Sequence, residues 1–133
     1  MINCRFCDIV NGSEDFVLWE NDNFMLLLDT IPCKKGHCLL IPKKHVDSIF
    51  DLDKNLYDEM FSIIKKLEKP LCKVTNAKRL GLILTGFEIP HAHIHLVPLH
   101  GSNELFDEGL FKKADSEELK KVQEKIRMNL EKI

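Results

Sequence analysis

The sequence contains no hydrophobic run long enough to cross a membrane and no excess of basic side chains. Its longest apolar runs, such as Phe24–Leu28 and residues 38–41, are far shorter than the roughly 20 residues that a membrane helix needs. Arg5 and Asp8 interrupt the N-terminal segment before the apolar core of a signal peptide could form. The formal net charge of −2 provides no basic field for the phosphates of a nucleic acid. We therefore expect a cytoplasmic protein that binds neither membranes nor nucleic acids.

The chain also lacks any repeat, low-complexity tract or linker rich in glycine, proline and serine that would divide it. Its 133 residues are enough to bury a hydrophobic core without disulfide bonds. The hydrophobic fraction of 44% and the charged fraction of 30% are typical of a soluble globular protein. We expect a single domain over residues 1–133, with the motifs in residues 1–100 and a helical C-terminal extension in residues 101–133.

Five cysteines cannot all pair within one chain, and no secretory signal indicates an oxidising compartment. Cys33, Cys38 and Cys72 have apolar neighbours, so we expect reduced thiols in or near the core. Cys4 and Cys7 differ because they form a CxxC pair, which is typical of metal ligands or of redox-active thiols. No βαβ pattern like that of thioredoxin surrounds this pair, and redox chemistry is therefore the weaker interpretation.

Hydrophobic periodicity predicts an α+β fold with a mainly antiparallel sheet of about five strands. The expected strands are a segment ending at Trp19 and residues 24–29, 37–41, 80–84 and 91–97. The expected helices are a short turn within residues 4–10, a long helix over residues 53–75 and a C-terminal helix from Asp115. Pro70 is expected to kink or break the long helix near its end, because proline lacks the backbone N–H group.

Half of the six histidines lie at alternate positions of one short segment, as His91, His93 and His95. On a strand all three would point to one face, about 6.6 Å apart between neighbours and about 13 Å between the outer two. Zinc–nitrogen bonds measure only about 2.0–2.1 Å, so one ion can accept two adjacent members but not all three. A solvent-facing polar strand is the alternative, but three histidines in strict alternation favour a site. At least one histidine then needs a role away from the metal.

Two chemistries are compatible with this pattern. Two thiolates and two imidazoles would complete a tetrahedral zinc site, and four protein ligands leave no open position for a substrate, so such a zinc would be structural. A histidine that remains off the metal is neutral at pH 7 and can attack phosphorus as a nucleophile. Such a nucleophile needs its other ring nitrogen held by an acceptor, and it needs donors around the phosphate oxygens.

Three segments together resemble one known family. Residues 91–97, HAHIHLV, match the pattern His-φ-His-φ-His-φ-φ, in which φ is apolar, at every position. Residues 29–52, DTIPCKKGHCLLIPKKHVDSIFDL, resemble the second motif block of histidine triad (HIT) nucleotide-binding proteins. CRFCDIVNG near the N-terminus is similar to the zinc-bearing bacterial members. The resemblance spans about residues 4–98, leaves out the C-terminal helix, and implies the HIT fold.

The resemblance implies a role for each histidine of the motifs. His93 would be the nucleophile that forms a nucleotidyl-histidine intermediate at the α-phosphate. His95 would donate to the phosphate oxygens or assist the leaving group, with His37 beside it. One structural zinc ion per chain would be held by Cys4, Cys7, His45 and His91.

The resemblance also implies substrate contacts. Asp29 and Thr30 match positions that hold the ribose hydroxyls, and the positions of the apolar base pocket are matched by Phe6, Ile9 and Leu27. The segment before the triad departs from the family pattern, since Glu88 stands where a glutamine is usual and Thr85 is the nearest polar replacement for an asparagine. A carboxylate beside a phosphate is repulsive unless it points away, is protonated or binds an amine on the leaving group.

The resemblance therefore implies a homodimer, with the sheet continued across the interface, that binds purine nucleotides and cleaves nucleoside phosphoramidates at the α-phosphate. A dinucleoside polyphosphate hydrolase would use the same nucleophile and is the first alternative. The second alternative is a zinc-stabilised nucleotide-binding or scaffold module with little turnover.

Overall fold

The computed structural model describes residues 3–13, 15–102, 104–106 and 113–131. Its described strands form one antiparallel sheet in the order β1-β2-β3-β5-β4. They are β1 (Val17–Glu20), β2 (Phe24–Leu28), β3 (Cys38–Pro42), β4 (Arg79–Ile83) and β5 (Ile94–Leu99). The helices are α1 (Arg5–Val10), α2 (Lys54–Thr75) and α3 (Ser116–Leu130), with short 3-10 turns η1 (Ile49–Asp51) and η2 (Glu104–Phe106). The expected α+β fold with a five-stranded antiparallel sheet is confirmed.

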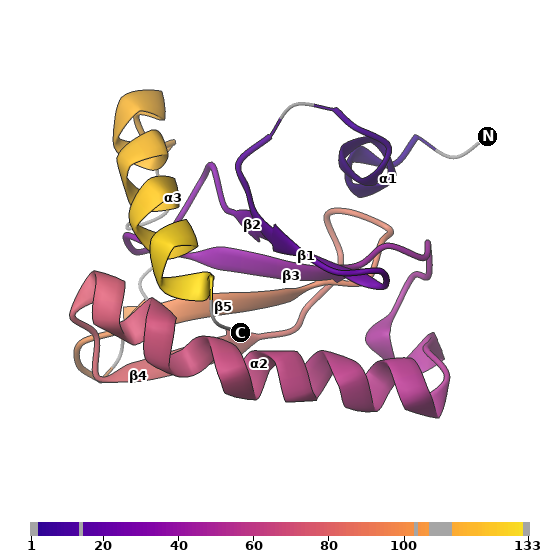
Figure 1. Cartoon of the computed structure of the whole chain (residues 1–133). Coiled ribbons are helices and arrows are strands. Elements are labelled where there is room, and N and C mark those ends of the chain that lie inside the picture. The colour runs from indigo at the N-terminus through magenta and orange to yellow at the C-terminus, as the bar shows by residue number, and fades with distance from the viewer. Residues whose placement is uncertain (1–2, 14, 103, 107–112, 132–133) are drawn as a thin grey trace.

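Both faces of the sheet are covered, with α2 on one face and α1 on the other (Figure 1). Successive side chains of a strand point to opposite faces, and all five residues of β2 are buried. Phe24, Leu26 and Leu28 belong to the larger core, which also contains the apolar sides of α2 and α3. Met25 and Leu27 belong to a smaller core beneath α1. This second core lies on the side of the sheet that carries the histidines.

Helix α2 begins at Asp53, whose side chain accepts a hydrogen bond from the backbone N–H of Leu56. Pro70 lies inside this helix, which continues to Thr75, so the expectation that proline would break the helix is wrong. The lost backbone hydrogen bond is outweighed because Leu67 and Leu71, on either side of Pro70, are fully buried in the main core.

The two edge strands of the sheet have different surroundings. Helix α3 packs against β1 and α2, and the side chain of Gln123 donates a hydrogen bond of 2.8 Å to the backbone carbonyl of Val17. The outer edge of β4 has no such cover among the described residues, and Leu82 and Leu84 there are 44% and 40% exposed. An unpaired apolar edge is a template for pairing with another strand.

Strand β5 begins at Ile94, so only His95 of the three histidines lies within it, and the expected start at His91 is wrong. The backbone explains the difference. The N–H of Ala92 donates to the carbonyl of Val46 at 2.7 Å, and the N–H of His91 donates to Ile89 at 2.8 Å. These bonds tie residues 91–92 to neighbouring loops instead of to the sheet.

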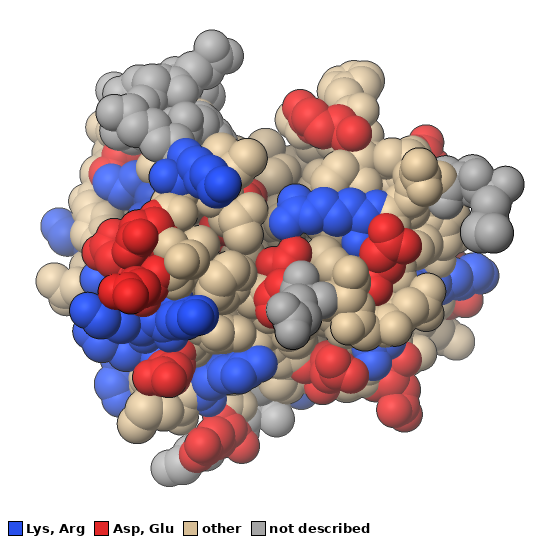
Figure 2. Space-filling view, turned by 90° about the horizontal axis from the view of Figure 1, so that it is seen from above, with Lys and Arg blue, Asp and Glu red and all other residues tan. Residues whose placement is uncertain are grey.

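No helix among the described residues combines the length and the apolar character needed to span a membrane. Seen from the side that carries α1, acidic and basic side chains are interspersed over the surface (Figure 2).

Candidate active site and metal centre

Two thiols and two imidazoles from distant parts of the chain meet beside α1. The Sγ atom of Cys4 lies 3.3 Å from Nδ1 of His91, and Sγ of Cys7 lies 3.1 Å from Nδ1 of His45. The two Nδ1 atoms are 3.3 Å apart, and all four ligand atoms lie within 4.8 Å of one another. Tetrahedral zinc at ordinary bond lengths places its ligand atoms about 3.3–3.8 Å apart. The cluster therefore fits zinc in both chemistry and size.

The orientation of His91 supports the same conclusion. Its Nε2 lies 2.7 Å from the backbone carbonyl oxygen of Pro42, which can only accept a hydrogen bond. The ring proton is therefore on Nε2, and the lone pair of Nδ1 faces Cys4 and His45. Metal-binding histidines are commonly held in this way by a carbonyl on the far ring nitrogen.

His93 is buried and its tautomer is fixed in the same way. Its Nδ1 lies 2.7 Å from the backbone carbonyl oxygen of His91, so Nδ1 carries the proton and donates it. The lone pair is then on Nε2, the atom that a nucleophile needs. Phe6 of α1 packs edge-on against this ring, with a centroid distance of 5.2 Å.

A chain of hydrogen bonds leads from the backbone to His95. The N–H of Cys33 donates to Nδ1 of His37 at 3.1 Å, which leaves the His37 proton on Nε2. That Nε2 lies 2.9 Å from Nδ1 of His95 and 3.4 Å from a carboxylate oxygen of Asp29. Because Nδ1 of His95 accepts this bond, the remaining proton of His95 lies on Nε2. The chain thus makes Nε2 of His95 a hydrogen-bond donor.

Burial keeps these imidazoles neutral. Desolvation, assisted by the charge of His95, lowers the pKa of His37 to about 3. Desolvation and the charge of His93 lower the pKa of His95 to about 4, against the charge of Glu88, which raises it. Burial also raises the pKa of Asp29 above its ordinary value. At pH 7 both imidazoles are neutral in the protein without substrate.

Asp29, His37 and His95 form a second group whose ligand atoms lie within 4.8 Å of one another. Metal binding would require a lone pair on Nε2 of His37, the atom that faces the group. The N–H of Cys33 places the proton on that atom. We therefore interpret this group as a hydrogen-bonded chain that fixes the tautomers of His37 and His95, and not as a metal site.

The histidines open into a cavity of about 510 Å³ on the α1 side of the sheet. Of the residues expected to bind substrate or react with it, those lining the cavity are Phe6, Asp29, Thr85, Glu88, His93 and His95. The lining also includes residues that the sequence did not indicate, namely Arg5, Ile31, Leu39, Ile83, Ile89 and Leu105. Leu39 and Ile83 pair directly with His95 across the sheet, so a correct strand register would have identified them.

Three expected base and ribose contacts lie elsewhere. Ile9 and Leu27 are buried in the small core beneath α1 and support the cavity from behind. Thr30 uses its carbonyl oxygen to accept a hydrogen bond from the N–H of Ala114 at 3.1 Å, and it does not line the cavity.

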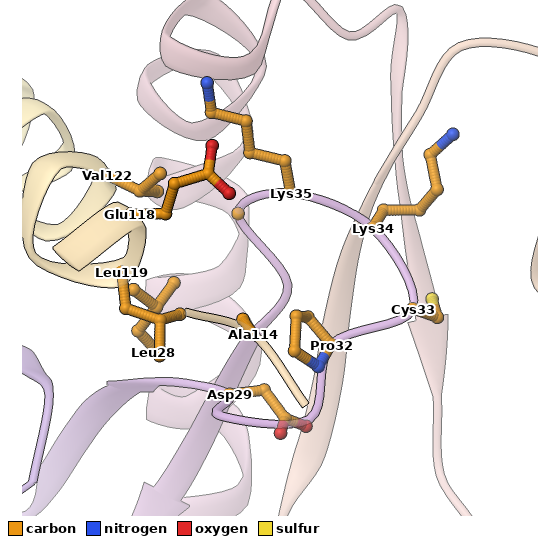
Figure 3. Close-up of a pocket in the computed structure, with 11 residues that line it drawn as sticks. Leu28, Asp29, Pro32, Cys33, Lys34, Lys35, Ala114, Glu118, Leu119 and Val122 are labelled. Atoms are coloured by element: carbon orange, nitrogen blue, oxygen red, sulfur yellow. The ribbon is translucent and has the colours of Figure 1, made fainter. Parts of the chain in front are cut away.

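A second cavity, of about 290 Å³, lies between residues 32–36 and α3 (Figure 3). Leu28, Leu119 and Val122 gather on its α3 side, and the Lys34 side chain extends away from them (Figure 3). None of the described histidines lines this cavity. We therefore place the candidate active site in the first cavity, which His93 and His95 line.

Comparison with known proteins agrees with this geometry. The family model described as the HIT domain matches residues 11–102. An uncharacterized HIT-like protein of Methanocaldococcus jannaschii is 32% identical over 89% of this chain and 96% of its own length. An adenosine 5′-monophosphoramidase of Schizosaccharomyces pombe is 31% identical over 73% of this chain and 74% of its own length.

The fold is similar to that of a solved structure, a hypothetical histidine triad nucleotide-binding protein of Sulfolobus tokodaii. The two share 28% identity and a TM-score of 0.86, with 97% of this chain and 93% of the other covered. Together with the family model over residues 11–102, this similarity shows that the chain belongs to the histidine triad family.

Proposed function

We propose that the protein is a nucleotide-binding hydrolase that cleaves purine nucleoside phosphoramidates at the α-phosphate through a covalent intermediate on His93. The observation that supports this most strongly is the hydrogen bond from Nδ1 of His93 to the carbonyl of His91, which leaves the Nε2 lone pair at the cavity. The related monophosphoramidase of Schizosaccharomyces pombe supports the substrate class. In this proposal Asp29 holds the ribose, and Phe6 and Leu39 contact the base.

In the first step, Nε2 of His93 attacks phosphorus and the bond between phosphorus and the leaving nitrogen breaks. The anionic phosphoryl group raises the pKa of His95 on binding, because a cation beside it is then favoured. The second proton of the resulting imidazolium is on Nδ1, which faces a carboxylate oxygen of Asp29 3.8 Å away. The imidazolium of His95 gives its Nε2 proton to the departing amine and becomes neutral, with its remaining proton on Nδ1. The products of this step are a free amine and a nucleotidyl group on His93.

In the second step, water attacks the same phosphorus atom and His95 accepts the proton that the water loses. The bond between phosphorus and Nε2 of His93 breaks, and this nitrogen recovers its lone pair. A nucleoside monophosphate leaves, and both histidines have the protonation states that they had in the substrate complex, with His95 as imidazolium. His95 releases its extra proton to solvent when the anionic product departs. The net reaction is hydrolysis of one P–N bond by one water molecule.

Zinc bound by Cys4, Cys7, His45 and His91 would have a structural role, because all four positions are filled by protein atoms. Its ligands join α1 to the segment that precedes β5. This connection supports the position of Phe6, which lies between the two cysteines and touches the His93 ring. None of the five cysteines forms a disulfide bond, which favours a reducing compartment such as the cytoplasm.

The same proposal includes a homodimer formed through the outer edge of β4. Leu82 and Leu84 are exposed there, and Phe61 of α2 is 37% exposed. Lys65, Glu68 and Lys69 of α2 line a groove with Leu80 and Leu82, so opposite charges flank an apolar strip. A second copy related by a two-fold axis could pair with this strand and continue the sheet.

The decisive experiment is a substrate panel of adenosine and guanosine phosphoramidates and dinucleoside polyphosphates, with mass detection of the His93 adduct. We expect phosphoramidates to be cleaved fastest and the adduct to carry one nucleotidyl group. His93→Ala should lose at least about a thousandfold in turnover while nucleotide binding is retained. His100→Ala is the matched control, because this histidine is exposed, does not line the cavity, and forms its bonds within the described residues with the Thr75 carbonyl and Glu104.

Each other outcome identifies an alternative. If dinucleoside polyphosphates are cleaved faster than phosphoramidates, they are the substrate class. Nucleotide binding without turnover in the wild-type protein would favour a binding module. Turnover that survives in His93→Ala would show that the nucleophile is wrong.

A further inference from the structure

Glu88 contributes a carboxylate to the cavity that the proposed mechanism does not use. It lies in the loop between β4 and β5 and lines the same cavity as His93 and His95. Glu88 is exposed, and within the described part of the chain it makes no hydrogen bond or ion pair. An unpaired carboxylate in a cavity proposed to bind phosphate repels anionic groups of a ligand and attracts cationic ones.

The other charged groups of the cavity already have partners. Arg5 forms an ion pair with Asp15 at 2.9 Å. One carboxylate oxygen of Asp29 accepts a hydrogen bond from the N–H of Ile31 at 2.8 Å, and the other faces His37. Glu88 therefore adds a negative charge to the cavity that no ion pair with another described side chain offsets.

The charges of Arg5 and Asp15 act on Asp29, whereas the charge of Glu88 acts on His95 and raises its pKa. Glu88 lines the same cavity as the two catalytic histidines, and its charge acts on one of them. An attacking and a leaving group lie roughly in line through phosphorus. The leaving group consequently departs on the side of the phosphate away from His93, into the cavity that Glu88 lines.

We infer that Glu88 selects leaving groups that carry a positive charge. The substrates are then nucleoside 5′-phosphoramidates whose departing amine bears a second, cationic amino group, as in a diamine. Sulfate or polyphosphate leaving groups would add negative charge beside Glu88 and be repelled, whereas an ammonium group would be attracted. This inference rests on the proposed function, since it concerns the substrate of the same site.

The test uses three adenosine 5′-phosphoramidates with leaving amines of similar length. These amines are 1,3-diaminopropane, which is cationic, n-butylamine, which is neutral, and β-alanine, which is anionic. Values of kcat/KM are measured for the wild-type protein, for Glu88→Gln and for the control Glu124→Gln. Glu124 is exposed on α3 and does not line the cavity, so this control makes the same change in net charge elsewhere.

We expect the wild-type protein and Glu124→Gln to prefer the cationic over the neutral substrate by about three- to tenfold. The anionic substrate should be slower by a similar factor. Glu88→Gln should reduce the ratios of kcat/KM between the three substrates toward one, whatever its effect on the absolute rates. Salt at 0.5 M should reduce the wild-type preference, because exposed charges are screened.

Two failures can be told apart. Release of AMP at rates that do not depend on the charge of the amine, or an unchanged preference in Glu88→Gln, overturns the inference and leaves the proposed function intact. A folded wild-type protein that releases AMP from none of the three substrates overturns the proposed function, and the inference with it.

Discussion

The Nδ1 atom of His93 lies 2.7 Å from the backbone carbonyl oxygen of His91, a residue whose own Nδ1 faces the metal cluster. The same residue thus contributes one nitrogen to the candidate metal cluster and, through its carbonyl, fixes the proton of the proposed nucleophile. Any movement of His91 changes the direction of this carbonyl. The two sites are separate in chemistry but coupled through one peptide group.

This coupling predicts that loss of a metal ligand reduces turnover as well as metal binding. Cys7→Ala should purify with far less than one zinc per chain, unfold at a lower temperature and release nucleoside monophosphate more slowly. The physical reason is that α1, with Phe6, is then no longer tied to the segment before β5. Elemental analysis, thermal unfolding and turnover provide three independent measurements.

Cys72→Ala is the control for this prediction, because Cys72 is a free thiol on α2 outside the cluster. It should keep both zinc and turnover. One zinc per chain retained by Cys7→Ala would show that the four residues are not the metal site.

A second prediction concerns stability in acid. The pKa of His37 is about 3 in the folded protein and near its ordinary value of 6.5 in the unfolded chain. Between these values the unfolded state binds the extra proton, so the free energy of unfolding falls as the pH decreases from about 6.5 toward about 3. One such group contributes a slope of at most about 1.4 kcal/mol per pH unit.

His37→Gln removes the titrating group but keeps an amide N–H that can donate to His95. Its free energy of unfolding, measured by urea titration from pH 4.5 to 6.5, should therefore fall less steeply than that of the wild-type protein. Acid loss of metal affects both proteins, so the difference between the slopes reports His37. Equal slopes would contradict the buried neutral histidine.

The sequence was sufficient for the fold class because β2 and β3 are continuous apolar runs, typical of buried strands, and α2 has helical periodicity. All three elements are buried as these patterns indicate. The start of β5 was predicted wrongly, because strict alternation describes an extended backbone but not its hydrogen-bond partner. The bond from Ala92 to Val46 is a long-range contact that no local pattern encodes. The continuation of α2 through Pro70 likewise depends on tertiary packing.

Some parts of the candidate site could likewise be predicted from the sequence and others could not. The spacing of the histidines alone indicated only that one ion could not bind all three. The family resemblance was needed to bring His45 and the N-terminal cysteines together, since they are far apart in sequence. Arg5 and Leu105 line the cavity through the placement of α1 and η2, and nothing in their local sequence indicates it.

A third prediction concerns Gly36, which precedes His37 and has a φ of +83°. A Cβ atom there would lie 2.5 Å from Cγ2 of Thr75. Gly36→Ala should therefore destabilise the protein by about 1–3 kcal/mol from backbone strain alone, with a further cost from the clash. Urea unfolding measures the sum.

The double variant Gly36→Ala with Thr75→Ser separates the two costs. Serine lacks Cγ2 but keeps the hydroxyl that donates to the carbonyl of Leu71, so only the clash is relieved. Gly101→Ala is the control, since a Cβ atom there meets nothing within 4 Å. A Gly36→Ala protein as stable as Gly101→Ala would contradict both the strain and the clash.

The last prediction concerns the outer edge of β4, where Leu82 is 44% exposed. If two copies pair along this edge, Leu82→Lys places two ammonium groups in an apolar contact and should raise the dimer dissociation constant at least about tenfold. Sedimentation equilibrium should give twice the chain mass of 15.4 kDa for the wild-type protein and a single chain mass for the variant. Met128→Lys is the matched control, because Met128 of α3 is 71% exposed and does not line the groove that contains Leu82. A wild-type protein that sediments as a monomer at micromolar concentration would show that the edge remains unpaired, and the exposure of Leu82 would then need another explanation.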